Sequence, residues 1–290
     1  MLRILRELLP SKLRNSLREK SLIRKAVAQN EIFYCRALSG ESDYNICINS
    51  DLTVSCNCQD FDGSGHIGDL NSHTLEQIFS GPTANKFRSL LAARKFPIPT
   101  CSHCSDLKAI PASEVNVALS KDHVPDNGIM VENTVLCNLR CHMCNREKFM
   151  ELRSGKLSLS LSDVEKIALL LKEYGFKRLL YFNLGEPFLP TDILEQIKII
   201  RKYNPEIRII TSTNGQLLDK SNKIEAALMM DYIFVSLDGV NQDTVSKYQV
   251  GGNFETAYQN IATLVAERNK LGKRTPIVKW RRLLGQVYKQ

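Results

Sequence analysis

The second half of the chain alternates between short apolar runs and longer stretches in which apolar residues recur every three or four positions. The short runs are rich in Val, Ile, Leu and Thr and predict strands, whereas the longer stretches predict amphipathic helices. Strands that alternate with helices pair in parallel, so the pattern predicts an α/β fold. The predicted strands are 128–136, 178–182, 208–212, 232–235 and 277–280, and the predicted helices are 162–174, 191–203, 221–230 and 254–271.

The first of these helices shows the pattern well. Between Asp163 and Tyr174, apolar residues such as Ile167 and Leu170 recur at helical spacing beside charged residues. Ser162 is the predicted N-cap, because a serine side chain can accept a hydrogen bond from a free backbone N–H at a helix start. We expect the apolar stripe to pack on the sheet.

The first 30 residues form a separate basic segment. Leucines recur every four positions among arginines, and Pro10 with Ser11 divides the segment into two predicted helical pieces. We expect the leucines to dock on the protein's own domain or on a partner, with contact to an anionic membrane surface as the alternative. Charges interrupt every apolar stretch, which is unlike a secretory signal. The leucines are Leu5, Leu9, Leu13 and Leu17.

Three cysteines follow the first predicted strand of the sheet. Cys137, Cys141 and Cys144 have the spacing CxxxCxxC, which offers an iron–sulfur cluster three thiolates and leaves one iron free to bind a reactant. Buried core cysteines and a structural zinc site are competing interpretations, but a closed zinc site needs four ligands. The triplet follows the C-terminal end of a strand, where barrel enzymes keep their catalytic residues.

At these residues the chain resembles the radical S-adenosylmethionine (SAM) enzymes, whose signature is CxxxCx(aromatic or apolar)C. Segments 181–187, 211–215 and 235–239 each follow a predicted strand and are similar to further motifs of that family. The first resembles its glycine–glycine–glutamate motif, with Leu184 in place of one glycine. The resemblance implies that the three cysteines hold a 4Fe-4S cluster. It also implies that SAM contacts Met143, Gly185, Glu186, Pro187, Asn214 and Ser236.

A second group of cysteines precedes this region, and the segments around it resemble the SPASM domain, which holds an auxiliary iron–sulfur cluster. A structural zinc is the alternative here, because a CxxC pair with two remote cysteines also suits zinc. The resemblance implies Cys35, Cys56, Cys101 and Cys104 as the four ligands of an auxiliary 4Fe-4S cluster, with Cys58 or Cys47 as an alternate.

The resemblance also implies an activity. Radical SAM enzymes use one electron to cleave SAM reductively, and the resulting 5'-deoxyadenosyl radical abstracts a hydrogen atom from the substrate. We therefore expect an oxidoreductase or maturase, with a peptide or protein as the first candidate substrate and a flavodoxin or ferredoxin as reductant. A non-catalytic iron–sulfur or zinc-binding module is the alternative, because Leu184 departs from the family pattern.

The predicted organisation has four parts. A basic segment covers residues 1–30, a SPASM-like domain 31–109, a linker 110–127, and a partial (β/α)6 radical SAM barrel 128–290. The auxiliary domain of this family normally follows the barrel, whereas here it precedes it. Because five barrel strands are predicted instead of six, we expect a C-terminal truncation and an open strand edge. We expect the N-terminal domain or a partner chain to cover that edge, unless the chain is a fragment and the edge stays uncovered.

Composition and charge narrow the class of protein. The net charge of +8 lies at the ends of the 290-residue chain, with +6 in residues 1–30 and +8 in residues 268–290, so the middle is acidic. This distribution is unlike the basic, aromatic-rich surface of a nucleic-acid-binding protein, and we expect no specific nucleic acid partner. Nine cysteines in closely spaced groups favour metal thiolates in a reducing cytoplasm over a secreted disulfide framework.

Overall fold

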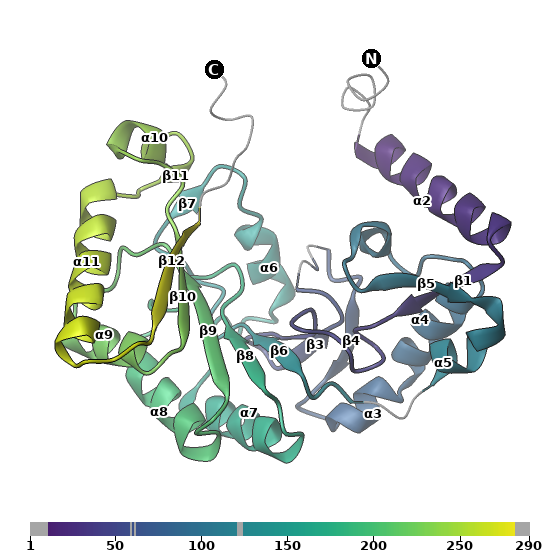
Figure 1. Cartoon of the computed structure of the whole chain (residues 1–290), viewed down its shortest axis with the longest axis horizontal. Helices are drawn as coiled ribbons and strands as arrows, with labels where there is room; N and C mark the ends of the chain where they lie inside the picture. The colour runs from purple at the N-terminus through teal and green to yellow at the C-terminus, as the bar shows by residue number, and fades with distance from the viewer. Residues whose placement is uncertain (1–10, 59, 61, 121–123, 282–290) are drawn as a thin grey trace.

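The computed structural model describes residues 11–58, 60, 62–120 and 124–281. An eight-stranded sheet runs through the molecule (Figure 1). Five of its strands come from the second half of the chain, lie side by side in chain order and pair in parallel, which confirms the predicted α/β class. These strands are β6 (Gly128–Val131), β8 (Arg178–Tyr181), β9 (Arg208–Thr213), β10 (Tyr232–Ser236) and β12 (Ile277–Arg281).

Four crossover helices accompany these strands and bury their apolar stripes in the main core. The strand that precedes the cysteine triplet is shorter than the predicted range 128–136, since β6 ends at Val131. Ser162 is wrong as a helix cap: Ser160 accepts from the backbone N–H of Asp163, whose carboxylate accepts from the backbone N–H of Ser160. The helices are α7 (Leu161–Glu173), α8 (Ile193–Tyr203), α9 (Ser221–Leu228) and α11 (Phe254–Lys270).

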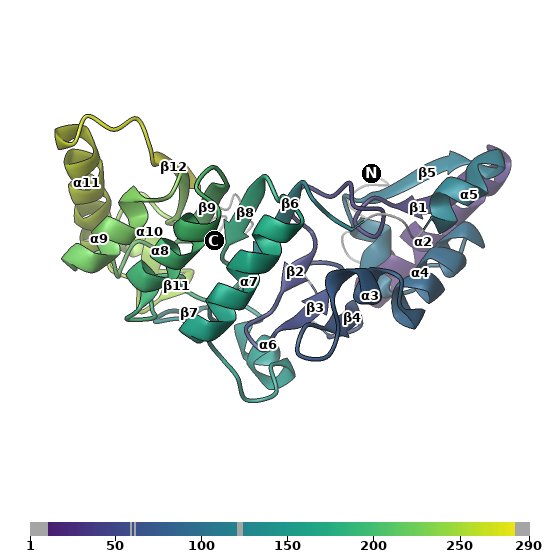
Figure 2. The ribbon, with the colours of Figure 1, turned by 90° about the horizontal axis from the view of Figure 1, so that it is seen from below.

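The N-terminal domain supplies the other three strands of the sheet, β2 (Cys47–Ile48), β3 (Thr53–Ser55) and β4 (His66–Asp69). β2 pairs in parallel with β6 and antiparallel with β3, so it lies between the two domains (Figure 2). The N-terminal domain therefore covers the β6 edge of the parallel strands. The backbones of the two domains pack closely at this edge, since a Cβ on Gly128 would lie 1.8 Å from the carbonyl oxygen of Asp43.

The rest of the N-terminal domain packs around a two-stranded sheet of β1 (Glu31–Cys35) and β5 (Leu107–Pro111). Helix α4 (Pro82–Ala92) packs on β1, and the short helix α3 (Leu75–Phe79) contacts both α4 and β4. Helix α2 (Ser11–Ala28) contacts the domain through Ala26, which packs with Phe33 and Leu91. Within the described residues, no helix combines the length and the apolar character needed to cross a membrane.

Two expectations about this half of the chain need adjustment. The leucines of the basic segment do not all dock on the domain, because the side chains of Leu13 and Leu17 are 46% and 42% exposed, and Leu5 and Leu9 lie outside the described residues. The segment predicted as a linker is folded as far as α5 (Val115–Leu119), where Ala118 packs against β1.

Candidate functional site

A cavity of about 640 Å³ lies where the loops after the parallel strands meet. Because parallel strands end at the same edge of a sheet, motifs that are far apart in sequence converge there. The cavity wall contains most of the residues predicted from the SAM motifs. Those residues are Cys137, Cys141, Met143, Cys144, Gly185, Glu186, Asn214 and Ser236.

Pro187 is the predicted site residue that does not line the cavity. Its carbonyl oxygen instead accepts a hydrogen bond of 3.0 Å from the side-chain Nδ2 of Asn133, which is buried. Pro187 thus shapes the loop after β8 from behind the wall. Met143 does lie on the wall, but its side chain is 69% exposed.

The cysteine loop is fixed by a short strand pair. β7 (Arg140–Cys141) pairs antiparallel with β11 (Gln249–Val250), which places Cys141 opposite Gln249. The backbone N–H of Cys144 donates to the carbonyl of Cys141 at 3.1 Å, so the last two cysteines of the triplet share one turn. A segment more than 100 residues downstream therefore holds the triplet in place.

Gln249 also braces the loop that follows β10. Its Nε2 donates to the carbonyl of Ser236 at 2.8 Å, and its Oε1 accepts from the backbone N–H of Asp238 at 3.0 Å. The side chain is buried and lines the cavity. Sequence reasoning missed Gln249, because nothing in the local pattern distinguishes a glutamine on a two-residue strand.

Glu186 connects the loops after β8 and β9. One carboxylate oxygen accepts from the Thr213 hydroxyl at 2.7 Å and from the Phe188 backbone N–H at 3.2 Å, and the other accepts from the Asn214 backbone N–H at 2.8 Å. Burial raises the pKa of Glu186 to about 6, although these hydrogen bonds oppose the shift. Glu186 is 2% exposed, and its three hydrogen-bond donors fix the orientation of the carboxylate.

Gly185 allows the same loop to approach the cysteine loop. A Cβ at this position would lie 2.0 Å from the carbonyl oxygen of Thr134 and 2.9 Å from that of Leu136. The next residue, Glu186, donates its backbone N–H to the Leu136 carbonyl at 2.8 Å. Glycine is required here because backbone packs directly against backbone.

The three thiols fit an iron–sulfur cluster by their chemistry. Burial and the neighbouring Cys144 and Cys137 raise the pKa of Cys141 to about 12, since several thiolates close together repel one another. Bound cations reverse this effect and favour the deprotonated form. The Asn214 side chain donates to the Cys137 sulfur at 3.8 Å, which suits a thiolate.

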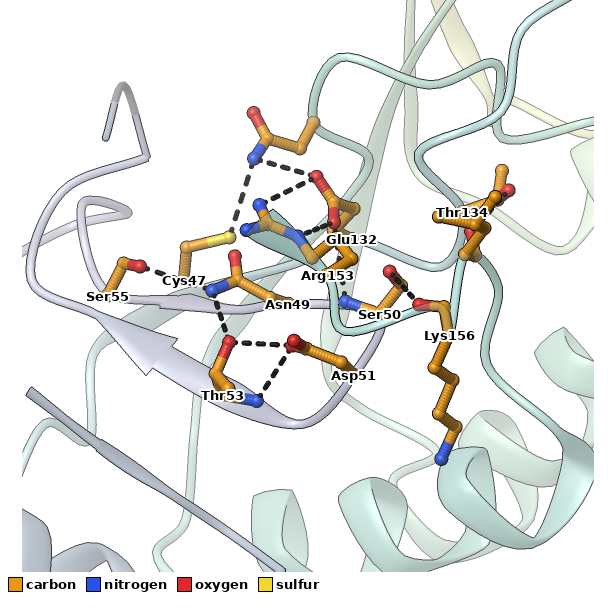
Figure 3. Close-up of polar contacts among 12 residues, drawn as sticks. Cys47, Asn49, Ser50, Asp51, Thr53, Ser55, Glu132, Thr134, Arg153 and Lys156 are labelled. Atoms are coloured by element: carbon orange, nitrogen blue, oxygen red, sulfur yellow. Dashed lines mark hydrogen bonds and ion pairs between the residues drawn. The ribbon is translucent and has the colours of Figure 1, made fainter. Parts of the chain in front are cut away.

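A buried ion pair stands behind the cavity, at the junction of the two domains (Figure 3). Arg153 Nε lies 2.6 Å from a Glu132 carboxylate oxygen, and the two side chains are 4% and 0% exposed. Asn183 on the cavity wall donates through Nδ2 both to Glu132 at 3.2 Å and to the Cys47 sulfur at 3.7 Å. The backbone N–H of Ser50, in the β2–β3 turn, also donates to Glu132. The N-terminal domain thus helps to position the wall of the cavity.

A second cavity lies inside the N-terminal domain, and all four preferred auxiliary ligands line it. Cys35 ends β1, Cys56 follows β3, and Cys101 lies on the 3₁₀ helix η1 (Pro99–His103), with Cys104 directly after it. The remaining wall is largely apolar, with Leu38, Phe87, Leu91, Ile98 and Leu107.

These four thiols form a donor set that is suited to a cluster. Burial raises the pKa of Cys35 to about 12 and that of Cys101 to about 11, and the neighbouring thiols add to both shifts. Among the described residues, no three His, Cys, Asp or Glu side chains form a group arranged to hold a single metal ion. The four cysteines therefore line one cavity, but their side chains are not arranged around a single metal ion.

Cys58 and Cys47, the alternates, do not line this cavity. Cys58 donates to the side-chain oxygen of Asn45 at 3.6 Å, and Cys47 is buried against Asn183. The structure thus brings together the preferred set of four and leaves the alternates outside it.

Two protein-family models match the chain. The radical SAM superfamily model matches residues 131–274, and the model of the iron–sulfur cluster-binding SPASM domain matches residues 35–105. The chain therefore contains a radical SAM domain and a SPASM domain. The cofactors of these domains are the SAM-binding 4Fe-4S cluster, SAM and the iron–sulfur cluster of the SPASM domain, and the cysteines that line the two cavities provide thiolate donors for the clusters.

Relatives of this chain include two proteins that are named for one reaction. A probable GTP 3',8-cyclase of Methanococcus maripaludis is 37% identical over 130 residues, which cover 44% of this chain and 42% of the relative. The GTP 3',8-cyclase of Helicobacter pylori is 28% identical over 151 residues, which cover 52% and 47%. The chain thus spans about half the length of the relatives it matches.

A solved structure, BtrN in complex with AdoMet and 2-DOIA, matches 53% of this chain and 56% of its own chain. Its TM-score is 0.39 and its sequence identity is 20%.

Proposed function

We propose that this chain cleaves SAM reductively and directs the abstraction of a hydrogen atom from a substrate. The observation that carries the proposal is the convergence of the three cysteines and the ends of β8, β9 and β10 on one cavity of about 640 Å³. When bound there, the cluster and SAM supply the electron and the 5'-deoxyadenosyl radical. The protein supplies binding, orientation and protection from water.

The residues of the cavity wall divide into three roles in this proposal. Cys137, Cys141 and Cys144 hold the cluster. Glu186 and Gly185 face the methionyl amine, and because the carboxylate of Glu186 already accepts three hydrogen bonds, it also fixes the loop that surrounds the amine. Asn214 and Ser236 are proposed to contact the ribose or the methionyl carboxylate of SAM.

The proposed substrate is a peptide or a protein. The charge of the cavity wall supports this over a nucleoside triphosphate: among the described lining residues, Arg281 is the one cation, and Glu186 and Asp238 are acidic. Triphosphates are generally bound by several cationic side chains or by metal ions. A GTP cyclase is the second candidate, because the two relatives above carry that name.

Anaerobic reconstitution with iron and sulfide, followed by reduction in the presence of SAM, tests the function. The measurement is the rate of 5'-deoxyadenosine formation without a substrate, with GTP and with a library of short peptides. Stimulation by peptides and not by GTP is the expected result. Stimulation by GTP alone would establish the second candidate, and absence of 5'-deoxyadenosine in every arm would indicate a non-catalytic iron–sulfur module.

A further inference from the structure

Helix α2 lies on the segment that carries two of the auxiliary cysteines. Arg18 Nε donates to the carbonyl oxygen of Ser102, which lies between Cys101 and Cys104, at 2.7 Å. A second contact of 3.1 Å joins the side-chain oxygen of Asn15 to the His103 ring. Figure 1 shows α2 on the outside of the N-terminal domain, away from the parallel strands. Whatever binds α2 is therefore brought next to the auxiliary cavity.

The exposed side of α2 is strongly basic. Its one acidic residue is Glu19, which is half-buried. Within the described part of the chain, no carboxylate forms an ion pair with the exposed basic side chains of the helix, so their charge is uncompensated. These side chains are Arg14, Arg18, Lys20, Arg24 and Lys25.

The same helix leaves a small apolar patch exposed. Leu13 and Leu17, one turn apart, are 46% and 42% exposed and lie among the basic residues. Two exposed leucines with a charged rim resemble the small apolar centre and polar rim of a protein–protein interface. A membrane-surface helix would need a continuous apolar face, but Leu22, Ile23 and Ala26 are packed against the domain.

We propose that α2 is the docking surface for an acidic electron-transfer protein. This inference rests on the proposed function, which consumes one electron for each SAM cleaved. Docking itself makes and breaks no covalent bond. The carrier, a reduced flavin or iron–sulfur protein, would be oxidised by one electron, and an iron–sulfur cluster bound by Cys101 and Cys104 would accept that electron. Complementary charge steers such an encounter and makes its rate sensitive to salt.

The test is a stopped-flow measurement of the bleaching of iron–sulfur absorbance in the reconstituted full chain, mixed with reduced flavodoxin at low and high salt. The variant carries Arg14→Glu, Lys20→Glu and Arg24→Glu, which leave the Arg18 contact in place. The control carries Lys172→Glu, Lys177→Glu and Lys202→Glu, which change the net charge equally at exposed sites of the radical SAM domain. Iron content and reduction by dithionite are measured for each protein.

The expected result is a tenfold or greater loss of the second-order rate constant at low salt in the α2 variant, with reduction by dithionite unchanged. The control variant should keep most of the wild-type rate. An equal loss in both variants, or no loss in the α2 variant, would overturn the proposal. A variant with Gln at the same three α2 positions should show a smaller loss of the rate constant. This variant replaces the Glu variant in the test if the Glu variant does not fold.

A membrane role gives a different outcome. Sedimentation with phosphatidylserine vesicles would then show binding that the α2 variant loses, while reduction by flavodoxin stays at the wild-type rate, and this would overturn the proposal. Failure of the proposed function is distinct, because it would appear as absence of 5'-deoxyadenosine with dithionite as the reductant in the wild type.

Discussion

Among single residues, Glu132 and Arg153 contribute most clearly to joining the two domains. Removal of one partner of a buried ion pair leaves the other charge uncompensated and costs about 3–5 kcal/mol. We expect Glu132→Ala to lower the free energy of unfolding by about that amount in chemical denaturation. Replacement of both residues by Met should cost less, because no buried charge then remains.

The exposed pair Lys198–Glu225 is the matched control. Its nitrogen–oxygen distance is 3.1 Å and both side chains are more than half exposed. Glu225→Ala should change the free energy of unfolding by less than about 1 kcal/mol. Equal losses for Glu132→Ala and Glu225→Ala would contradict the structural role of the buried pair.

Gly185 is a second residue whose replacement has a clear consequence. Gly185→Ala places a methyl group 2.0 Å from a backbone oxygen, so either the cysteine loop or the loop after β8 must move. Overpacking of this kind costs about 1–3 kcal/mol. We expect a lower melting temperature and loss of SAM binding in a calorimetric titration. Leu184→Ala, at the neighbouring position, should keep the wild-type melting temperature more closely.

Among the elements, α7 provides a prediction for pH dependence. Burial alone would raise the pKa of Asp163, but hydrogen bonds from Lys156 at 2.8 Å and from the cap residue Ser160 outweigh burial and lower it. The ionised carboxylate therefore stabilises the fold above the ordinary Asp pKa of about 3.9, and this contribution is lost as the pH falls through the lower folded-state pKa.

Urea denaturation between about pH 6 and pH 3 checks this sign, since that range spans the ordinary Asp pKa. The wild type should lose more stability on acidification than Asp163→Asn, which cannot titrate. Lys156→Ala should shift the loss to higher pH, because the carboxylate then lacks its nearest cation. Identical acid dependence in wild type and Asp163→Asn would show that Asp163 does not contribute.

The elements also show what the sequence could predict. The parallel strands and their helices were predictable because each has its own local periodicity. β2 and the β7–β11 pair have two residues per strand, and long-range backbone pairing defines them, so no local pattern signals them. The cysteine triplet was predictable from its spacing, and Gly185 and Glu186 were predictable from the resemblance of segment 181–187 to a motif of the radical SAM family. Gln249 and Asn183 were not, because their roles depend on contacts with distant loops.

At the scale of the whole molecule, the N-terminal domain completes the sheet as well as carrying the auxiliary cysteines. β2 occupies the edge of β6, so deletion of residues 1–109 would expose that edge. Exposed strand edges promote aggregation. We expect the deletion variant to elute as large species in size-exclusion chromatography with light scattering, under conditions that keep the full chain dispersed. A monodisperse deletion variant would show that the junction is dispensable.

The central claim is that Cys137, Cys141 and Cys144 form the site of SAM cleavage. The most direct measurement is 5'-deoxyadenosine formation, together with iron content, in the reconstituted wild type and in Cys141→Ala. About eight irons in the wild type, about four in the variant and loss of 5'-deoxyadenosine in the variant are predicted, since each cube holds about four irons. Unchanged 5'-deoxyadenosine formation in Cys141→Ala, or its absence from an iron-loaded wild type, would contradict the claim.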